Sequence, residues 1–163
     1  MSHRYLTPPG PFAPAGLLRR LAAVAYDALL CLALLIVATF LYKLAWMAVL
    51  GEAKLRAMSD SGVLDHDPLL ATLLVFIAFG FFAKFWTHNG QTLGMQAWGI
   101  RVQNADGSRI SLWQALLRFL VAIGSWGCLG IGYVWIALDR HKRSWHDIYS
   151  GSQVVRVPRT PHP

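Results

Sequence analysis

Two arginines and two aspartates lie in or beside apolar runs, where charged side chains are uncommon. They are Arg20, Asp27, Arg118 and Asp147. A charge near the centre of a bilayer is costly, so such a side chain usually faces water or a protein partner. A carboxylate beside an arginine stays ionised, whereas an unpaired buried one tends to bind a proton. We therefore take these four residues as candidates for a buried polar network or an ion-binding site.

Asp27 follows Arg20 by seven residues in a run that predicts a helix. Two helical turns place both side chains on nearly the same face, about 10 Å apart along the axis, so we expect no direct contact between them. One interpretation of Asp27 is structural, with a partner arginine in the cytoplasmic loop or at Arg118. The other is a carboxylate that binds a proton or an ion. The sequence is compatible with both.

Arg118 stands in the otherwise apolar run WQALLRFLVAI. One alternative is that its long side chain extends to the membrane interface, as arginines near helix ends do. The other is that it pairs with Asp27 inside the protein. The first alternative makes it an anchor, and the second makes it one half of a buried salt bridge.

The segment DRHKRSWHDIYSG, residues 139–151, carries Asp147 together with two histidines and a basic run. His141 and His146 are five residues apart and so do not share a helix face, and no HExxH or CxxC pattern accompanies them, so no metal site is expected. The basic run 140–143 predicts contact with anionic lipid headgroups. Asp147 stays a candidate because it precedes a glycine-terminated turn and a strand-like tail.

Other chemistries find no support in the motifs. No nucleophile–base arrangement is apparent, and the sequence lacks GxSxG and a GK[ST] phosphate loop. GQTLGMQAWG does not have the GxGxxG spacing, so its Gly90, Gly94 and Gly99 more simply permit tight turns or close helix approach. We expect no enzyme, no cofactor and no metal.

Composition indicates a membrane protein. The 163 residues are 55% hydrophobic and 14% charged, against roughly 25% charged in an average soluble domain. The net charge of +7 arises mainly from basic residues that flank apolar blocks, which favours retention at the cytoplasmic membrane face over nucleic-acid binding. Cys31 and Cys128 lie in apolar runs without a partner spacing, so no disulfide is expected.

Two apolar runs predict membrane-spanning helices. Residues 1–15 form a proline-rich tail that we expect to be flexible. Residues 21–50 predict one long helix, retained rather than cleaved as a signal peptide. The net acidic loop 51–68 fits the outer side, and 69–85 predicts a second span that returns to the cytoplasm.

The polar stretch after the second span predicts a cytoplasmic β-hairpin. Residues 100–103 and 109–111 flank the turn sequence Asn-Ala-Asp-Gly. The strand-like tail 153–157 is then available to pair with this hairpin.

The third apolar block, 112–138, holds four glycines between residues 124 and 132. Glycine weakens a helix interior. We favour a break there and a helical hairpin that returns the basic C-terminus to the cytoplasm; a single span remains the alternative.

Three segments are informative when taken together: RRLAAVAYD, then GQTLGMQAWGIRV with a later DG and LWQALLRF, and finally SWHDIYSGSQVV. As a set they resemble the RDD family of small bacterial integral membrane proteins. They stand in the family's order and cover nearly the whole chain, although none is specific alone. The position after Gly94, often basic in the family, is Met95, which removes support for a positive charge there.

The resemblance implies the roles of three residues. The family's name refers to an arginine and two aspartates, which it places at Arg20 or its neighbour Arg19, at Asp27 and at Asp147. It also implies a part in the transport of unidentified ligands across the bacterial inner membrane. The resemblance is carried by a membrane domain of residues 16–157, followed by a short tail, 158–163.

The expected fold is an all-α membrane protein. It is a small helical bundle with two full spans, a glycine-broken third block and a short cytoplasmic β-hairpin. We expect a multi-pass inner-membrane protein with a cytoplasmic N-terminus that helps to transport a small ion or another ligand through the Arg/Asp network. The alternative is a non-transporting assembly or interaction protein whose network is structural. Its partners would be the lipid bilayer and, to enclose a pathway, further copies of the chain.

Overall fold

The computed structural model describes residues 6, 12–61 and 67–158 of the chain. Most of the expected flexible tail, 1–15, and nearly all of the C-terminal tail, 158–163, lie outside the described residues. Residues 13–15, which we assigned to the tail, instead lie along the strand near the C-terminus: the backbone of Pro14 bridges Val155, and the Ala15 N–H donates to the Val154 carbonyl at 2.9 Å.

Two helices are long and apolar enough to cross a membrane, as the sequence predicted. They are α1, Leu17–Leu50, and α3, Pro68–His88. At 1.5 Å per residue, the 34 residues of α1 exceed what a hydrocarbon core of roughly 30 Å requires. The carboxylate of Asp67 caps the start of α3, where it accepts from the Leu69 N–H at 2.9 Å and the Leu70 N–H at 3.2 Å.

The chain divides into two compact units, which we describe separately. Residues 29–80 form one of them, with the later part of α1, the first part of α3 and a short helix α2, Glu52–Asp60. The sequence predicted only a loop there. Within this unit the Tyr42 hydroxyl donates to Asp67 Oδ2 at 2.6 Å.

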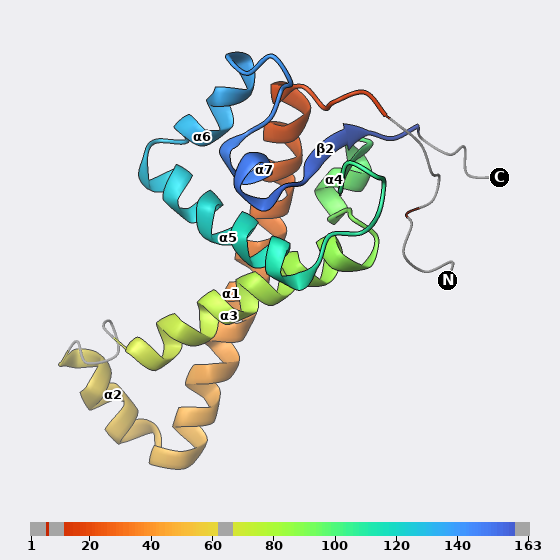
Figure 1. The fold of residues 1–163 in the computed structure, drawn as a ribbon. Coiled ribbons are helices and arrows are strands. Elements are labelled where there is room, and N and C mark those ends of the chain that lie inside the picture. The colour runs from red at the N-terminus through yellow and green to blue at the C-terminus, as the bar shows by residue number, and fades with distance from the viewer. Residues whose placement is uncertain (1–5, 7–11, 62–66, 159–163) are drawn as a thin grey trace. The chain divides into compact units, whose positions relative to one another are not determined.

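Residues 1–28 and 81–163 form the second unit, which contains the remaining elements. They are α4 (Leu93–Ala97), β1 (Ile100–Gln103), α5 (Leu112–Gly127), α6 (Ile131–Val134), η2 (Trp135–Ala137), α7 (Trp145–Ser150) and β2 (Gln153–Arg156). Figure 1 shows α7 between α5 and β2, in agreement with its packing on both. The apolar core of this unit gathers around the sheet, from Ile100, Val102, Ile110, Ala115, Val154 and Val155.

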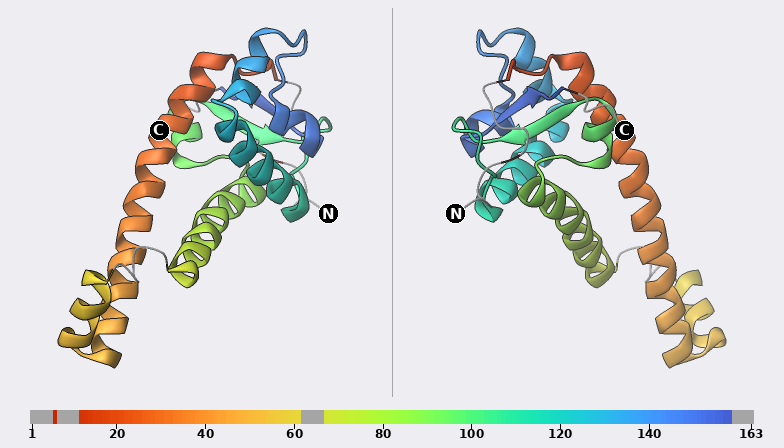
Figure 2. Two further views of the ribbon diagram at one scale, coloured as in Figure 1. Left: turned by 90° about the vertical axis from the view of Figure 1, so that its left-hand side faces the viewer. Right: turned by 90° about the vertical axis from the view of Figure 1, so that its right-hand side faces the viewer.

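The strands β1 and β2 lie side by side and antiparallel (Figure 2), with Ile100 opposite Arg156 and Gln103 opposite Gln153. The expected pairing of the tail with 100–103 is therefore confirmed, but the expected hairpin between 100–103 and 109–111 is wrong. Its turn does form, since the Gly107 N–H donates to the Asn104 carbonyl at 3.0 Å.

Residues 109–111, the expected second strand of that hairpin, instead lead directly into helix α5. Ser111 caps α5 in a capping box with Gln114, which commits the backbone to a helix start. In its place, β2 brings two buried β-branched side chains, Val154 and Val155, to the sheet.

The third apolar block is broken where its glycines predicted a break. The axes of α5 and of the α6–η2 arm differ by 110°. Between the two arms the backbone turns through Leu129 and Gly130, which have φ values of +54° and +76°.

The short helix α4 rests directly on α1. A Cβ atom placed on Gly94 would collide with the Ala23 carbonyl oxygen of α1 and would lie 2.9 Å from Asp27 Cγ. The close approach expected for this glycine is thus present, and the backbone of α1 cannot easily yield to a larger side chain.

We predict that Gly94→Ala lowers the stability of the protein by about 1–3 kcal/mol, the usual range for overpacking. Gly124→Ala is the matched control, because a Cβ on this helical glycine meets no atom within 4 Å and alanine favours a helix. Thermal unfolding of both variants in detergent provides the measurement. Equal melting temperatures for the two variants would contradict the assigned contact.

Candidate polar site

Asp147 is the centre of a buried polar cluster in the second unit. It occupies the third position of α7, and its Oδ2 accepts the Ser144 N–H at 3.1 Å in a capping box. The helix ends at Gly151, which adopts the left-handed conformation with φ +63°. The local sequence Ser-Trp-His-Asp thus starts the helix and fixes the direction of the carboxylate.

Two arginines from distant parts of the chain bind the two oxygens of this carboxylate. Arg20, in the first turn of α1, donates to Oδ2 from Nη1, and Arg118, in the middle of α5, donates to Oδ1 at 2.8 Å. The side chains of Arg20, Arg118 and Asp147 are 4%, 2% and 0% exposed. Asp147 is therefore a buried carboxylate bridged by two guanidiniums.

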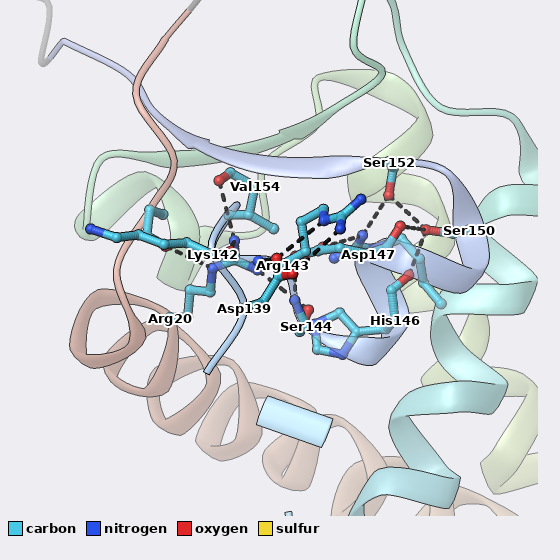
Figure 3. Close-up of polar contacts among 12 residues, drawn as sticks. Arg20, Asp139, Lys142, Arg143, Ser144, His146, Asp147, Ser150, Ser152 and Val154 are labelled. Carbon is cyan, nitrogen blue, oxygen red and sulfur yellow. Dashed lines mark hydrogen bonds and ion pairs between the residues drawn. The ribbon is translucent and has the colours of Figure 1, made fainter. Parts of the chain in front are cut away.

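Arg20 also binds the backbone of three further segments. Its Nε donates to the Ala15 carbonyl at 3.0 Å, and its Nη2 donates to the Lys142 carbonyl at 2.9 Å and the Val154 carbonyl at 3.4 Å. Figure 3 shows Arg20 together with Lys142, Val154 and Asp147. One side chain thus joins α1 to the segment before it, the loop before α7 and β2.

Arg118 completes the other side of the cluster. Its Nη1 also donates to the Ser152 hydroxyl, which exchanges a hydrogen bond of 2.7 Å with Ser150. Its guanidinium carbon lies 5.4 Å from the centroid of the Trp86 ring, near the end of α3, a distance at which cation–π attraction operates. Arg118 Nε is buried and has no hydrogen-bond partner among the described residues.

The electrostatics of the cluster favour an ionised carboxylate. Burial raises the pKa of Asp147, but the nearby charges of Arg118 and Arg20 lower it by a larger amount. The pKa of Asp147 therefore lies below its ordinary value. The adjacent His146 packs its ring 4.6 Å from that of Tyr133. Burial, assisted by the charge of Arg118, lowers the pKa of His146 to about 3, so its imidazole is neutral at pH 7.

Asp27 lies in a separate environment. Its Oδ2 accepts the Thr92 hydroxyl, and its Oδ1 accepts the Gly94 N–H at 2.8 Å. The residue is 2% exposed, and among residues 6, 12–61 and 67–158 it forms no ion pair. The partner of Asp27 is thus the start of α4 rather than an arginine.

The four predicted site residues therefore divide into two groups. Asp147 binds both Arg20 and Arg118. Within the described part of the chain, Asp27 forms hydrogen bonds with Thr92 and Gly94 and with none of these three residues. The structural pairing of Asp27 with Arg118 is wrong, because Arg118 is bound to Asp147. Of the two neighbouring arginines, Arg20 joins the Asp147 cluster, whereas Arg19 is exposed and donates to the Trp98 carbonyl at 3.2 Å.

Several residues of these two sites were not predicted from the sequence. Thr92, Ser144 and Ser152 are all buried and bind the charged groups. The spacing of Ser144 and Asp147, a capping-box pattern, was a readable signal, but Ser152 and Thr92 had none that pointed to a distant partner. In the described part of the chain no group of three or more His, Cys, Asp or Glu residues is placed to hold a metal ion.

Comparison with known proteins identifies relatives of the chain. The model of the RDD family matches residues 14–151. A Bacillus subtilis (strain 168) protein named "Uncharacterized protein YckC" is 31% identical over 96 residues, which are 55% of this chain and 62% of that protein. The match thus spans less than two thirds of the relative's length. No solved structure matches.

The buried His146 predicts a loss of stability in acid. Below its ordinary pKa of 6.5 the unfolded chain binds a proton at this imidazole, whereas the folded protein does so only near pH 3. The unfolded state then holds more protons, so the free energy of unfolding falls as the pH drops from about 6.5 toward 3. Asp147 acts in the same direction, beginning near its ordinary pKa of 3.8.

We expect His146→Phe, which keeps a ring against Tyr133, to flatten the pH dependence of the melting temperature between pH 6.5 and 4. His141→Phe is the matched control, because His141 is exposed and its loss leaves the wild-type profile. Thermal unfolding in detergent from pH 4 to 8 measures the effect. The assignment fails if the His146 variant shows the same slope as the control.

Proposed function

We propose that this chain, which belongs to the RDD family, is an integral membrane protein whose Arg20–Asp147–Arg118 cluster assembles its C-terminal segment onto the first membrane helix. The observation that carries the proposal is the saturation of Asp147: each carboxylate oxygen accepts from an arginine, and the side chain is fully buried. In this role the cluster is a structural lock, by which we mean a permanent contact that holds the C-terminal segment against α1.

The partners of Asp147 argue against a transport role for this carboxylate. A residue that carries ions must change its proton or cation occupancy during the cycle. Asp147 is held ionised by two guanidiniums, and an incoming cation would have to displace at least one of them. Removal of one partner from a buried ion pair is strongly destabilising, by about 3–5 kcal/mol. The cluster therefore suits a permanent contact better than a cycle.

A second candidate function, transport of a small ion, is favoured by the environment of Asp27. This carboxylate lies inside α1, which is long and apolar enough to cross a membrane, and it is 2% exposed. Within the described residues, the carboxylate accepts hydrogen bonds from a hydroxyl and a backbone N–H rather than from a cation. Buried carboxylates without a cation are the ones that exchange protons in membrane helices. If the protein moves an ion, Asp27 is the residue that carries it.

The charge distribution supports a placement in the bacterial inner membrane with a cytoplasmic N-terminus. Arg19 and Arg20 precede most of α1, and Lys84 lies near the end of α3, on the side to which two crossings return the chain. The exposed Arg140 and Lys142 then suit the anionic headgroups of that leaflet. A homo-oligomer would supply the further helices that an enclosed ion pathway requires.

The assembly role predicts that Arg20→Gln loosens β2. Without Arg20, Asp147 loses one charged partner and β2 loses the contact at the Val154 carbonyl. A loss of about 3 kcal/mol would speed hydrogen–deuterium exchange of the 153–156 amides by roughly a hundredfold when these amides exchange through local opening. Arg19→Gln, at the adjacent exposed arginine, should leave this exchange near the wild-type rate. Equal exchange in the two variants would rule out the lock.

The transport candidate predicts that Asp27→Asn abolishes ion movement. Reconstituted vesicles with an internal pH dye and an imposed sodium or potassium gradient provide the measurement. Asp60→Asn, at an exposed aspartate in α2, is the control and should retain flux. Absence of flux in the wild-type protein, or unchanged flux in Asp27→Asn, would exclude this candidate and leave the assembly role standing.

A further inference from the structure

The two ends of the third apolar block are held together by one sheet. β1 ends at Gln103, before the block, and β2 begins at Gln153, after it, and the two strands pair over four residues. The Val157 N–H also donates to the Gly99 carbonyl at 2.9 Å. Backbone hydrogen bonds cannot form across a hydrocarbon core of roughly 30 Å, so both ends lie on one side of the membrane. A single crossing between them is therefore excluded.

We propose that residues 112–138 form a wedge that enters and leaves the bilayer from the side on which the sheet lies. The wedge consists of α5, the bend at 128–130, α6 and η2, and its partner is the lipid of one leaflet. This proposal concerns the third block alone and does not depend on whether Asp27 transports an ion.

The length of the returning arm restricts the wedge to one leaflet. The arm consists of the four residues of α6 and the three residues of η2. At about 1.5 Å per α-helical and 2.0 Å per 3₁₀ residue, it rises about 12 Å. Half of the hydrocarbon core is about 15 Å. For the chain to cross the bilayer with α5 and return with this arm, the arm would have to span the whole core of roughly 30 Å, which is more than twice its length.

The outer surface of the wedge is apolar, whereas the two buried polar residues of α5 face inward beside the apolar Ala115. On α5, Arg118 and Ser125 face inward and are buried, while Leu120 and Trp126 are 53% and 59% exposed. At the bend, Leu129 is 93% exposed. A surface helix in water shows the reverse order, with its apolar face toward the core. Lipid is the solvent that such an outer surface fits.

The backbone at the bend is hydrogen-bonded within the protein, as lipid requires. The N–H groups of Cys128, Leu129 and Gly130 donate to carbonyls of Gly124, Trp126 and Ser125 at 3.1, 3.1 and 2.8 Å. An unsatisfied backbone group in hydrocarbon costs several kcal/mol. A bend in water does not need these three N–H groups to bind protein carbonyls, since water can accept from them.

The two arms are in close contact next to the bend. A Cβ on Gly132 would lie 2.5 Å from Ser125 Oγ, so glycine is needed where α6 meets α5. Trp126 and Tyr133 are in contact across the bend, with ring centroids 5.9 Å apart and ring planes inclined at 52°.

The open end of the wedge carries residues suited to the headgroup region. Trp113 near the start of α5 and Trp135 in η2 are 65% and 39% exposed, and tryptophan is enriched at membrane interfaces. Arg140 and Lys142 follow η2 and are exposed, and among the described residues neither forms an ion pair. Asp139 is already paired, with Arg143. The two unpaired cations fit anionic headgroups.

Single-cysteine accessibility tests the wedge in the full chain. The background is Cys31→Ala with Cys128→Ser, and the added cysteines are Ala105→Cys before the block, Leu129→Cys at the bend and His141→Cys after it. A membrane-impermeant maleimide is applied to right-side-out and inverted vesicles. We expect positions 105 and 141 to react from the same side and position 129 from neither side until detergent is added.

Two outcomes would overturn the wedge. Reaction of positions 105 and 141 from opposite sides would show a single span. Reaction of position 129 from water would show that the bend lies outside the bilayer.

A nitroxide attached at position 129 distinguishes lipid from a second copy of the chain. High accessibility to oxygen with low accessibility to a polar nickel relaxant supports lipid. Low accessibility to both would show a protein-covered tip and contradict lipid as the partner.

Discussion

The unit that contains both chain ends depends on one carboxylate shared by two guanidiniums. Asp147 receives Arg20 from the first helix and Arg118 from the fifth, and all three side chains are buried. Neither arginine could stay in this position without a counter-charge, because an unpaired buried charge is very costly. The positions of α1, α5 and α7 are therefore coupled: each element supplies a charge that the others neutralise.

Such a contact has particular value in a protein with so much apolar surface. In lipid, apolar faces gain little by meeting one another, so packing detail and polar contacts determine which helices associate. Arg20 stands in the first turn of α1 and reaches the backbone of β2 and of the loop before α7. The small sheet and the C-terminal helix are thus attached to the start of a candidate membrane helix by directional bonds.

Asp27 and Asp147 lie in different electrostatic environments. Asp147 is surrounded by positive charge, and Asp27 by a hydroxyl and a backbone N–H. A lock and an exchangeable site place opposite demands on a carboxylate, because the first must remain ionised and the second must change. The structure keeps the two environments separate, so the proposed contact role concerns Asp147 and the proposed exchange concerns Asp27.

The sequence by itself determined the elements that follow from local patterns. Long apolar runs predicted the two long helices, the glycines between 124 and 132 predicted the break, and the valines of the tail predicted a strand. It also singled out Arg20, Asp27, Arg118 and Asp147, because a charge in an apolar run is unusual in any fold. It did not predict α2, whose composition resembles that of a loop.

Only the tertiary structure decided which of these charges meet. Arg20 and Asp147 are 127 residues apart, and nothing in either local sequence specifies the other. The expected hairpin failed for the same reason: the turn after β1 was readable, but the partner of β1 came from fifty residues later, where Val154 and Val155 offered more apolar surface. Periodicity and composition report on neighbours along the chain, whereas the pairing of buried charges and strands depends on which distant segments the fold brings into contact.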